Sequence, residues 1–166
     1  RCQSAVPLPF LQKPLMTSSA PIRHRNLPLL LLHAREAVLS RFRPILNAHG
    51  VTEQQWRIIR ALLELGPREP RQIVDICGIS SPSLAGILAR MDDLGLIVKT
   101  PVDGDQRRVT VSLTAKSRGL ARRIAPQIEA TYADIEAALG KDFTDDAYRA
   151  LDALISRLGQ ADIAPK

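Results

Sequence analysis

The stretch SPSLAGILARMDDLGLIVKTPVDGDQRRVTVSLT, residues 81–114, decides the fold. Apolar residues recur in its first part at helical spacing, which predicts a helix with one buried face: Leu84, Ile87, Leu88 and Met91. Serines that can cap precede this helix, Pro82 lies in its first turn, and Gly95 follows its end. The residues LIVKT and VTVSL favour strands on either side of the turn PVDGDQRR. The stretch therefore predicts a helix followed by a two-stranded hairpin.

Two further helices are predicted just before this stretch. The residues TEQQ at 52–55 have the form of a capping box, and the helix that they open runs to Gly66. The residues EPRQIVDICG read as a short helix that ends at Gly78. A short helix, a glycine turn and a capped second helix form a helix-turn-helix pattern, and a hairpin behind it makes the winged version. In such a module the second helix enters the major groove of DNA.

Long helices are predicted on both sides of the module. Residues 27–48 carry an apolar helical stripe, in which Pro44 predicts a kink or a break. Thr114 is expected to cap a helix that ends near Leu139, with a kink at Pro126. Together these features predict a mainly α fold, with an α+β winged helix flanked by N- and C-terminal helices.

A last helix is predicted from a cap at Thr144 to about Leu158. Phe143 and Tyr148 would then occupy the two positions of a hydrophobic staple. Residues 159–166 are expected to form a tail.

The N-terminal residues 1–26 contain four prolines and little periodicity, which predicts an irregular arm. They lack the order of regions that a signal peptide has. Met16 resembles a natural start, so residues 1–15 are interpreted as an upstream extension, and the fold is predicted without them.

Composition narrows the function classes. The 166 residues are 45% hydrophobic, enough for a core, and no apolar run approaches the roughly 20 residues of a membrane span. The net charge of +6 suits a polyanionic partner, although the excess lies in residues 1–60 and residues 66–114 are balanced. Two cysteines predict no disulfide scaffold, and a cytoplasmic protein is expected. We expect no metal, cofactor or catalytic residue, and hence no enzyme, because no phosphate loop, metal spacing or nucleophile motif is present.

The outer face of the helix in residues 81–93 carries small and hydroxyl-bearing residues that would let it approach base edges closely. The candidate DNA contacts on this helix are Ser81, Pro82, Ser83, Gly86 and Arg90. The alternative is a plain surface helix, but such helices are usually richer in Glu and Lys.

The hairpin tip supplies further candidate DNA contacts, Gln106, Arg107 and Arg108. Arginines beside a recognition helix suit the adjacent minor groove, where narrow A·T tracts concentrate negative potential. Asp105 would structure the wing by holding Arg107 or by bonding turn amides. Taken alone, the same charges also fit a solvated turn.

The sequence DQRRVTVSLT resembles the wing signature of the MarR (multiple antibiotic resistance regulator) family, Asp-x-Arg-Asp-x-Arg followed by a strand and Leu-Thr. Asp105 and Arg107 match its second half, whereas Val102 and Gly104 depart from its first half. The resemblance covers residues 27–158. It implies a winged helix-turn-helix at 52–114, dimerisation helices at 27–48 and 115–158, and a homodimer on a pseudo-palindromic operator in double-stranded DNA.

Within the family, the motifs AREA, FRPI, TEQQWRI, PSLAGIL and DQRR are most similar to those of repressors of homoprotocatechuate (4-hydroxyphenylacetate) degradation operons. The resemblance implies a repressor released by a small phenolic or aromatic acid, bound between the dimerisation helices and the winged module. The candidate effector-binding residues are Arg35 for the carboxylate, His33 for a phenol, Arg43, and Trp56 as a ring face. Arg57 and Arg60 follow Trp56 and add to the local basic excess.

Other interpretations of the same residues stay open. Trp56 also fits the core, Arg43 also fits solvent or a phosphate, and Arg35 also fits a pair with a carboxylate such as Glu36 of another subunit. A cysteine at position 77 allows a regulator that responds to thiol oxidation, although no flanking base or cation activates it. A winged-helix module that binds protein rather than DNA is the remaining alternative.

Overall fold

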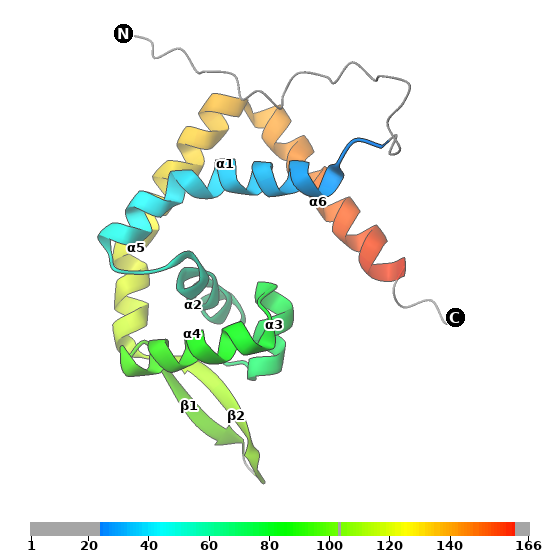
Figure 1. Ribbon diagram of the computed structural model, residues 1–166. Helices are drawn as coiled ribbons and strands as arrows, with labels where there is room; N and C mark the ends of the chain where they lie inside the picture. The colour runs from blue at the N-terminus through cyan, green and yellow to red at the C-terminus, as the bar shows by residue number, and fades with distance from the viewer. Residues whose placement is uncertain (1–23, 103, 162–166) are drawn as a thin grey trace. The chain divides into compact units, whose positions relative to one another are not determined.

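The computed structural model describes residues 24–102 and 104–161, so most of the expected arm at residues 1–26 and most of the expected tail lie outside the described part. Two compact units divide the chain between Glu36 and Ala37, and the first of them contributes the beginning of α1. The described part contains the following elements: α1 (Leu27–Ala48), α2 (Glu53–Leu65), α3 (Pro70–Cys77), α4 (Ser81–Asp93), β1 (Ile97–Val102), β2 (Asp105–Leu113), α5 (Ala115–Leu139) and α6 (Lys141–Ala161). The mainly helical winged fold that the sequence predicted is therefore confirmed (Figure 1).

The cap predicted for α2 and the glycines predicted after α3 and α4 act as expected, whereas the Ser80 side chain makes no cap hydrogen bond at the start of α4. The Thr52 hydroxyl accepts from the Gln55 backbone N–H at 3.2 Å, and the Gln55 side chain accepts from the Thr52 N–H at 3.0 Å, which confirms the capping box of α2. After α3, Gly78 adopts the left-handed conformation with φ 59°. At the end of α4, the Leu96 N–H donates to the Met91 carbonyl at 2.8 Å across Gly95 at φ 64°, a Schellman motif.

A single hydrophobic core lies where α2, α3, α4 and α5 meet the hairpin. The stripe predicted for α4 is buried, with Met91 fully inaccessible, and Ile58 and Ile124 are equally buried on α2 and α5. The C-terminal half of α1 adds Phe42, whose ring centroid lies 4.8 Å from that of Tyr132 on α5. This core holds α4 against α2, α3 and β1.

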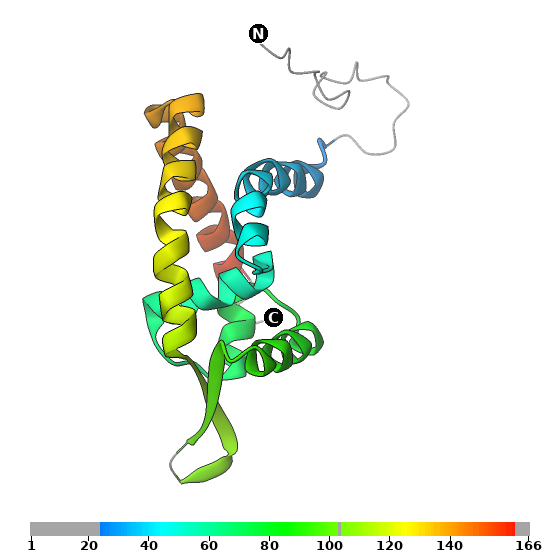
Figure 2. The same cartoon turned by 90° about the vertical axis from the view of Figure 1, so that its left-hand side faces the viewer.

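The predicted hairpin is confirmed, with β1 and β2 antiparallel and Ile97 opposite Leu113. It emerges where α4 ends and α5 begins (Figures 1 and 2). A short bridge that the sequence did not indicate pairs Arg68 with Val111: the Arg68 N–H donates to the Val111 carbonyl at 3.1 Å, and the return bond is 2.8 Å. The wing is thereby joined to the segment between α2 and α3.

The predicted start of the last helix is wrong. Helix α6 begins at Lys141, directly after Gly140 at φ 84°, so Thr144 lies inside the helix. Its hydroxyl donates back to the Gly140 carbonyl at 3.0 Å, where a cap would accept from a backbone N–H. Phe143 is accordingly no staple residue and is 60% exposed. Figure 2 shows α6 turning back from the end of α5.

The two prolines within long helices do not interrupt them. Helix α1 continues through Pro44, and α5 continues through Pro126, so the break considered at Pro44 does not occur. Pro44 takes one donor from the hydrogen-bond ladder of α1, but the buried neighbours Phe42 and Leu46 hold the helix against the core on either side of it.

Candidate nucleic-acid interface and effector pocket

The outward face of α4 is small and accessible, as the sequence predicted. Ser81, Pro82 and Ser83 are exposed in its first turn, and Gly86 is half-buried. The guanidinium of Arg90 lies across this face, 3.6 Å from the place where a Cβ on Gly86 would stand. The face therefore combines close approach with one cation, the combination that base-edge and phosphate contacts need.

The first turn of α4 begins at Ser80, whose side chain does not cap the helix. The Ser80 hydroxyl donates to the Ser83 hydroxyl at 2.9 Å. The first backbone N–H groups of α4 thus have no side-chain acceptor, in a turn whose residues 81–83 are exposed. This geometry suits a phosphate oxygen, because unpaired N–H groups and the helix dipole both favour an anion there.

Arg108 of the wing contacts the helix-turn-helix. Arg108 points back to the N-terminus of α3, where its guanidinium forms an ion pair with the Glu69 carboxylate, and its Nε donates to Glu69 Oε2 at 3.3 Å. The side chains of Asp105, Gln106 and Arg107 lie outside the described residues. In the free protein, Arg108 therefore fastens the wing to the helix-turn-helix.

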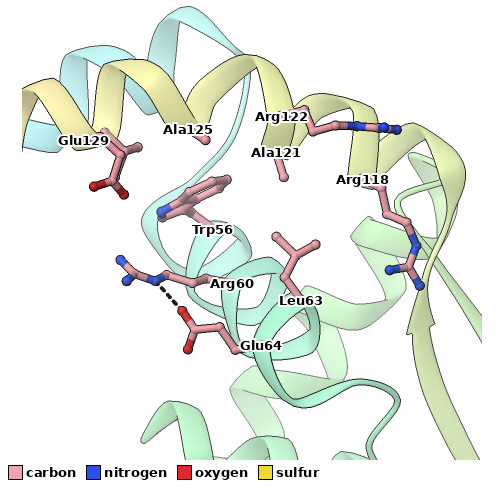
Figure 3. Close-up of a pocket in the computed structure, with 10 residues that line it drawn as sticks. Trp56, Arg60, Leu63, Glu64, Arg118, Ala121, Arg122, Ala125 and Glu129 are labelled. Carbon is pink, nitrogen blue, oxygen red and sulfur yellow. Dashed lines mark hydrogen bonds and ion pairs between the residues drawn. The ribbon is translucent and has the colours of Figure 1, made fainter.

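A pocket of about 300 Å³ opens between α2 and α5 (Figure 3). Ten residues line it: Trp56, Arg60, Leu63, Glu64, Arg118, Ala121, Arg122, Ala125, Ile128 and Glu129. Figure 3 shows Trp56 and Arg60 extending from α2 toward the space beside α5. Apolar walls with three guanidinium groups and two carboxylates favour a small amphipathic anion.

Arg60 is the best-anchored cation of this pocket. Its Nε donates to Glu64 Oε1 at 2.8 Å, and its Nη1 donates to the Tyr132 hydroxyl at 3.0 Å. The hydrogen bond to Glu64 raises the pKa of Arg60, while partial burial opposes that rise. The guanidinium is thus permanently charged and held in one orientation, as bidentate recognition of a carboxylate requires.

The four predicted effector residues do not gather in this pocket. Trp56 lines it and also packs against the core, so the pocket and core interpretations hold together. Arg43 Nε donates to Glu53 Oε1 at 2.5 Å, at the start of α2. His33 and Arg35 lie on the exposed first part of α1, which belongs to the other compact unit.

Arg118 and Arg122 are pocket residues that the sequence analysis missed. They are i and i+4 on α5, and Ala121 and Ala125 repeat the same spacing, so they follow one helix face. The sequence shows this i, i+4 spacing, but no sequence signal near these residues indicates that this face of α5 lies opposite Trp56. The pocket is lined by α2 and α5, whereas the expected cleft lay between residues 27–48 and the winged module.

The environment of Cys77 does not favour a reactive thiol. It is buried at the end of α3, and burial raises its pKa, which the charge of Arg57 only partly offsets. The thiolate that oxidation chemistry needs is therefore disfavoured.

Neither a metal nor a membrane-spanning helix is indicated in the part of the chain that the structure describes. No cluster of three or more His, Cys, Asp or Glu residues there could hold a metal ion. No single described helix is long and apolar enough to cross a membrane, and only the pair α3 and α4, bent by 111°, passes that test by length and composition.

The helix pair α3 and α4, the wing fastened beside it and the small exposed face of α4 define a winged helix-turn-helix protein of the DNA-binding class. The MarR family model matches residues 49–108. The chain is 40% identical to the HTH-type transcriptional regulator FarR of Neisseria gonorrhoeae, over 72% of this chain and 82% of that protein. It is 44% identical to the homoprotocatechuate degradative operon repressor of Escherichia coli, over 69% of this chain and 77% of that protein. The chain therefore belongs to the MarR family of transcriptional regulators.

Solved structures agree with this assignment. NadR in complex with 4-hydroxyphenylacetate matches with a TM-score of 0.70 and 37% identity, over 84% of this chain and 96% of that one. The repressor CouR, bound to a 23-mer DNA duplex, matches with a TM-score of 0.69 and 25% identity, over 78% and 92%. The protein is a MarR-type DNA-binding transcriptional regulator, in a family of regulators rather than enzymes.

Proposed function

We propose that this chain is a homodimeric repressor of an operon for aromatic-acid degradation, and that a small phenolic acid such as 4-hydroxyphenylacetate releases it from its operator. The observation that carries the proposal is the pocket between α2 and α5, in which the Trp56 ring lies near the Arg60 guanidinium. The names of the Escherichia coli repressor and of the NadR complex support the same class of ligand.

The chemistry of a phenolic acid matches the pocket. Its ring would lie against Trp56 and the alanines of α5, and its carboxylate would accept from a guanidinium. The volume of about 300 Å³ is at the small end of ligand pockets, which suits a single aromatic ring. Arg60 is the first choice for the carboxylate because its bond to the Tyr132 hydroxyl on α5 already holds it in place. Arg118 and Arg122 add positive charge from the opposite wall.

A second copy of the chain would complete the DNA-binding unit. Large apolar side chains of α6 remain exposed, namely Phe143, Tyr148, Leu151, Ile155 and Leu158. An apolar face of this length is more stable against a partner than in water. We infer that α6 contributes to a dimer interface, with α1 and α5 as the other dimerisation helices. Two winged modules would then meet two half-sites.

On DNA, the first turn and outer face of α4 would read the major groove through Ser81, Pro82, Ser83, Gly86 and Arg90. The wing residues Gln106, Arg107 and Arg108 would reach the neighbouring minor groove, with Asp105 structuring the tip. Release then follows if the acid binds better to a spacing of the two recognition helices that does not fit the operator. An acid that bound both spacings equally would have no effect.

The test is fluorescence anisotropy of a labelled duplex from the protein's own upstream region, with and without 4-hydroxyphenylacetate or 3,4-dihydroxyphenylacetate. Binding that is tight, falls steeply with salt and is reversed by either acid is the expected result. Arg60→Met should weaken the acid by about 10- to 100-fold, since a hydrogen-bonded charge pair contributes roughly 1.5–3 kcal/mol. Arg149→Met is the matched control, because Arg149 pairs with Asp146 on α6 and lies outside the pocket.

Three results would count against the proposal. Tight operator binding that neither acid reverses would remove the phenolic-acid effector. If Arg60→Met bound the acid with the same affinity as the unsubstituted protein, the assignment of this pocket as the effector site would be wrong. Absence of any salt-sensitive duplex binding would favour a winged module that binds protein.

A further inference from the structure

Two cationic side chains on the pocket helices α2 and α5 donate hydrogen bonds to carbonyls at the C-terminal ends of α3 and α4. Arg57 on α2 donates from Nη1 to the carbonyl of Cys77, the last residue of α3, at 2.9 Å. Lys116 on α5 donates from Nζ to the carbonyl of Leu94, the C-cap of α4, at 2.6 Å. The last carbonyls of a helix lack intrahelical donors, and its C-terminus favours a cation. Each helix of the helix-turn-helix thus ends on a charged side chain from a pocket helix.

The contact at the end of α4 is reinforced by Thr114. Its hydroxyl donates to the Gly95 carbonyl at 2.8 Å, and its backbone N–H donates to the Leu96 carbonyl at 3.2 Å. The same hydroxyl accepts from the Ser117 N–H at 3.3 Å and so begins α5. The start of α5 and the end of α4 are therefore one hydrogen-bonded junction.

The residues next to these two cations line the pocket. On α2, Arg57 lies between Trp56 and Arg60. On α5, Lys116 lies half a turn before Arg118, which stands on the opposite wall. Over so few residues a helix moves nearly as a rigid body. A ligand that changes the separation of α2 and α5 must therefore also displace the carbonyls that Arg57 and Lys116 hold.

We propose that Arg57 and Lys116 are positioning residues that couple ligand binding in the pocket to the position of the helix-turn-helix. When the ligand shifts α2, Arg57 moves α3 with it, and when the ligand shifts α5, Lys116 moves α4 with it. This inference rests on the proposed function, because it needs an acid in the pocket and an operator on α4. It adds the physical connection between the two sites, through atoms that belong to neither. Coupling of two sites requires such an element whose position both ligands bias.

A purely structural role gives a different result. If the two cations only cap helices, their loss weakens operator binding to the same degree with and without the acid. If they transmit displacement, their loss lowers the ratio of the operator Kd with acid to the operator Kd without it. The affinity of the acid itself should stay the same in both cases, because neither side chain lines the pocket.

The experiment measures that ratio for the full chain with 4-hydroxyphenylacetate as the probe, by anisotropy of the labelled upstream duplex. Calorimetry without DNA gives the Kd of the acid. Lys116→Met and Arg57→Met each remove a cation while keeping an unbranched side chain, and Lys116→Arg restores the donor. Lys141→Met is the control, since Lys141 pairs with Asp145 on α6 and contacts neither helix of the helix-turn-helix.

For Lys116→Met and Arg57→Met, we expect the ratio to fall by about fivefold or more, while the Kd of the acid changes by less than about twofold. Lys116→Arg should recover most of the ratio, and Lys141→Met should keep all of it. An unsubstituted protein that the acid does not release overturns the proposed function and this inference with it. If Lys116→Met and Arg57→Met both keep the ratio of the unsubstituted protein, this inference is overturned and the proposed function still stands.

Discussion

Arg60 donates from Nη1 to the Tyr132 hydroxyl at 3.0 Å, which joins α2 to α5 across 72 residues of sequence. The same guanidinium lies 5.8 Å from the centroid of the Tyr132 ring and bonds Glu64 within its own helix. Because the Tyr132 ring also contacts Phe42, one arginine connects the pocket to the C-terminal half of α1. The pocket is therefore built on contacts that are distant in sequence.

Removing the competing carboxylate beside Arg60 should strengthen effector binding. In Glu64→Gln, the side chain keeps one amide oxygen as an acceptor but loses the negative charge that competes with the acid for the guanidinium. The Arg60–Glu64 pair is largely exposed, so the gain is about 0.2–1 kcal/mol, or up to about fivefold in the Kd of 4-hydroxyphenylacetate. Calorimetry checks it, with Asp146→Asn, which breaks the pair with Arg149 on α6, as the control. Weaker binding in Glu64→Gln would mean that Glu64 positions Arg60 rather than competing for it.

The capping box of α2 should contribute measurably to stability. Thr52→Ala removes the acceptor for the Gln55 N–H, and such losses cost about 1 kcal/mol. For a chain of this size the Tm should fall by about 2–4 °C, which scanning calorimetry at a fixed protein concentration can measure. Thr131→Ala deletes the same groups inside α5, where the hydroxyl only bonds back to the Gln127 carbonyl, and should leave the Tm nearly unchanged. Equal changes in both variants would contradict the role of the cap.

Much of this fold could be predicted from local sequence signals. The capping residues, the glycines at helix ends and the apolar spacing of α4 act within a few residues, and they placed the winged module correctly. Thr144 shows the limit of such signals. It reads as a cap, but α6 begins at Lys141, directly after Gly140 at φ 84°, four residues before the start that a cap at Thr144 implies.

The sites depended on contacts that local signals do not carry. Arg108 was expected at the DNA, and Glu69 holds it from 39 residues away. Arg118 and Arg122 line the pocket because α5 packs along α2, which only the complete core determines. The sequence singles out Trp56 as an aromatic ring near arginines, but the residues that line the pocket with it are determined by the packing of α5 along α2.

Cys77 should be unreactive in the folded protein. Burial raises its pKa, so the thiol keeps its proton at pH values where the unfolded chain has begun to lose it. The stability contributed by this group is accordingly complete below the unfolded pKa near 9.0 and declines as the pH rises through the folded value. Iodoacetamide at pH 7.5, followed by peptide mapping, should label Cys77 slowly until denaturant is added. Rapid labelling of the native protein, or loss of operator binding with peroxide that Cys77→Ala prevents, would restore thiol sensing.

The exposed face of α6 should control dimerisation. Ile155 is 66% exposed, and a charge there would have to be buried in any interface that covers it. Ile155→Asp is expected to shift the chain toward monomer in sedimentation velocity. Operator binding should weaken as well, because each monomer then binds its half-site independently. Arg157→Asp, an exposed polar residue two positions along α6, should have a much smaller effect. A dimer unchanged by Ile155→Asp would remove α6 from the interface.

Arg108 should change partners when DNA binds. In the free protein it pairs with Glu69 and fastens the wing to α3. That pair is partly exposed and contributes at most about 1 kcal/mol, so a phosphate can compete for the guanidinium. Arg108→Met should therefore weaken operator binding and reduce the slope of log Kd against log salt by about one for each phosphate that Arg108 neutralises. Glu69→Gln separates the two roles, since it removes the ion pair with Glu69 without removing the charge of Arg108 and should keep the full slope. If Arg108→Met kept the full slope while binding weakened, the arginine would serve the wing's attachment and not the DNA.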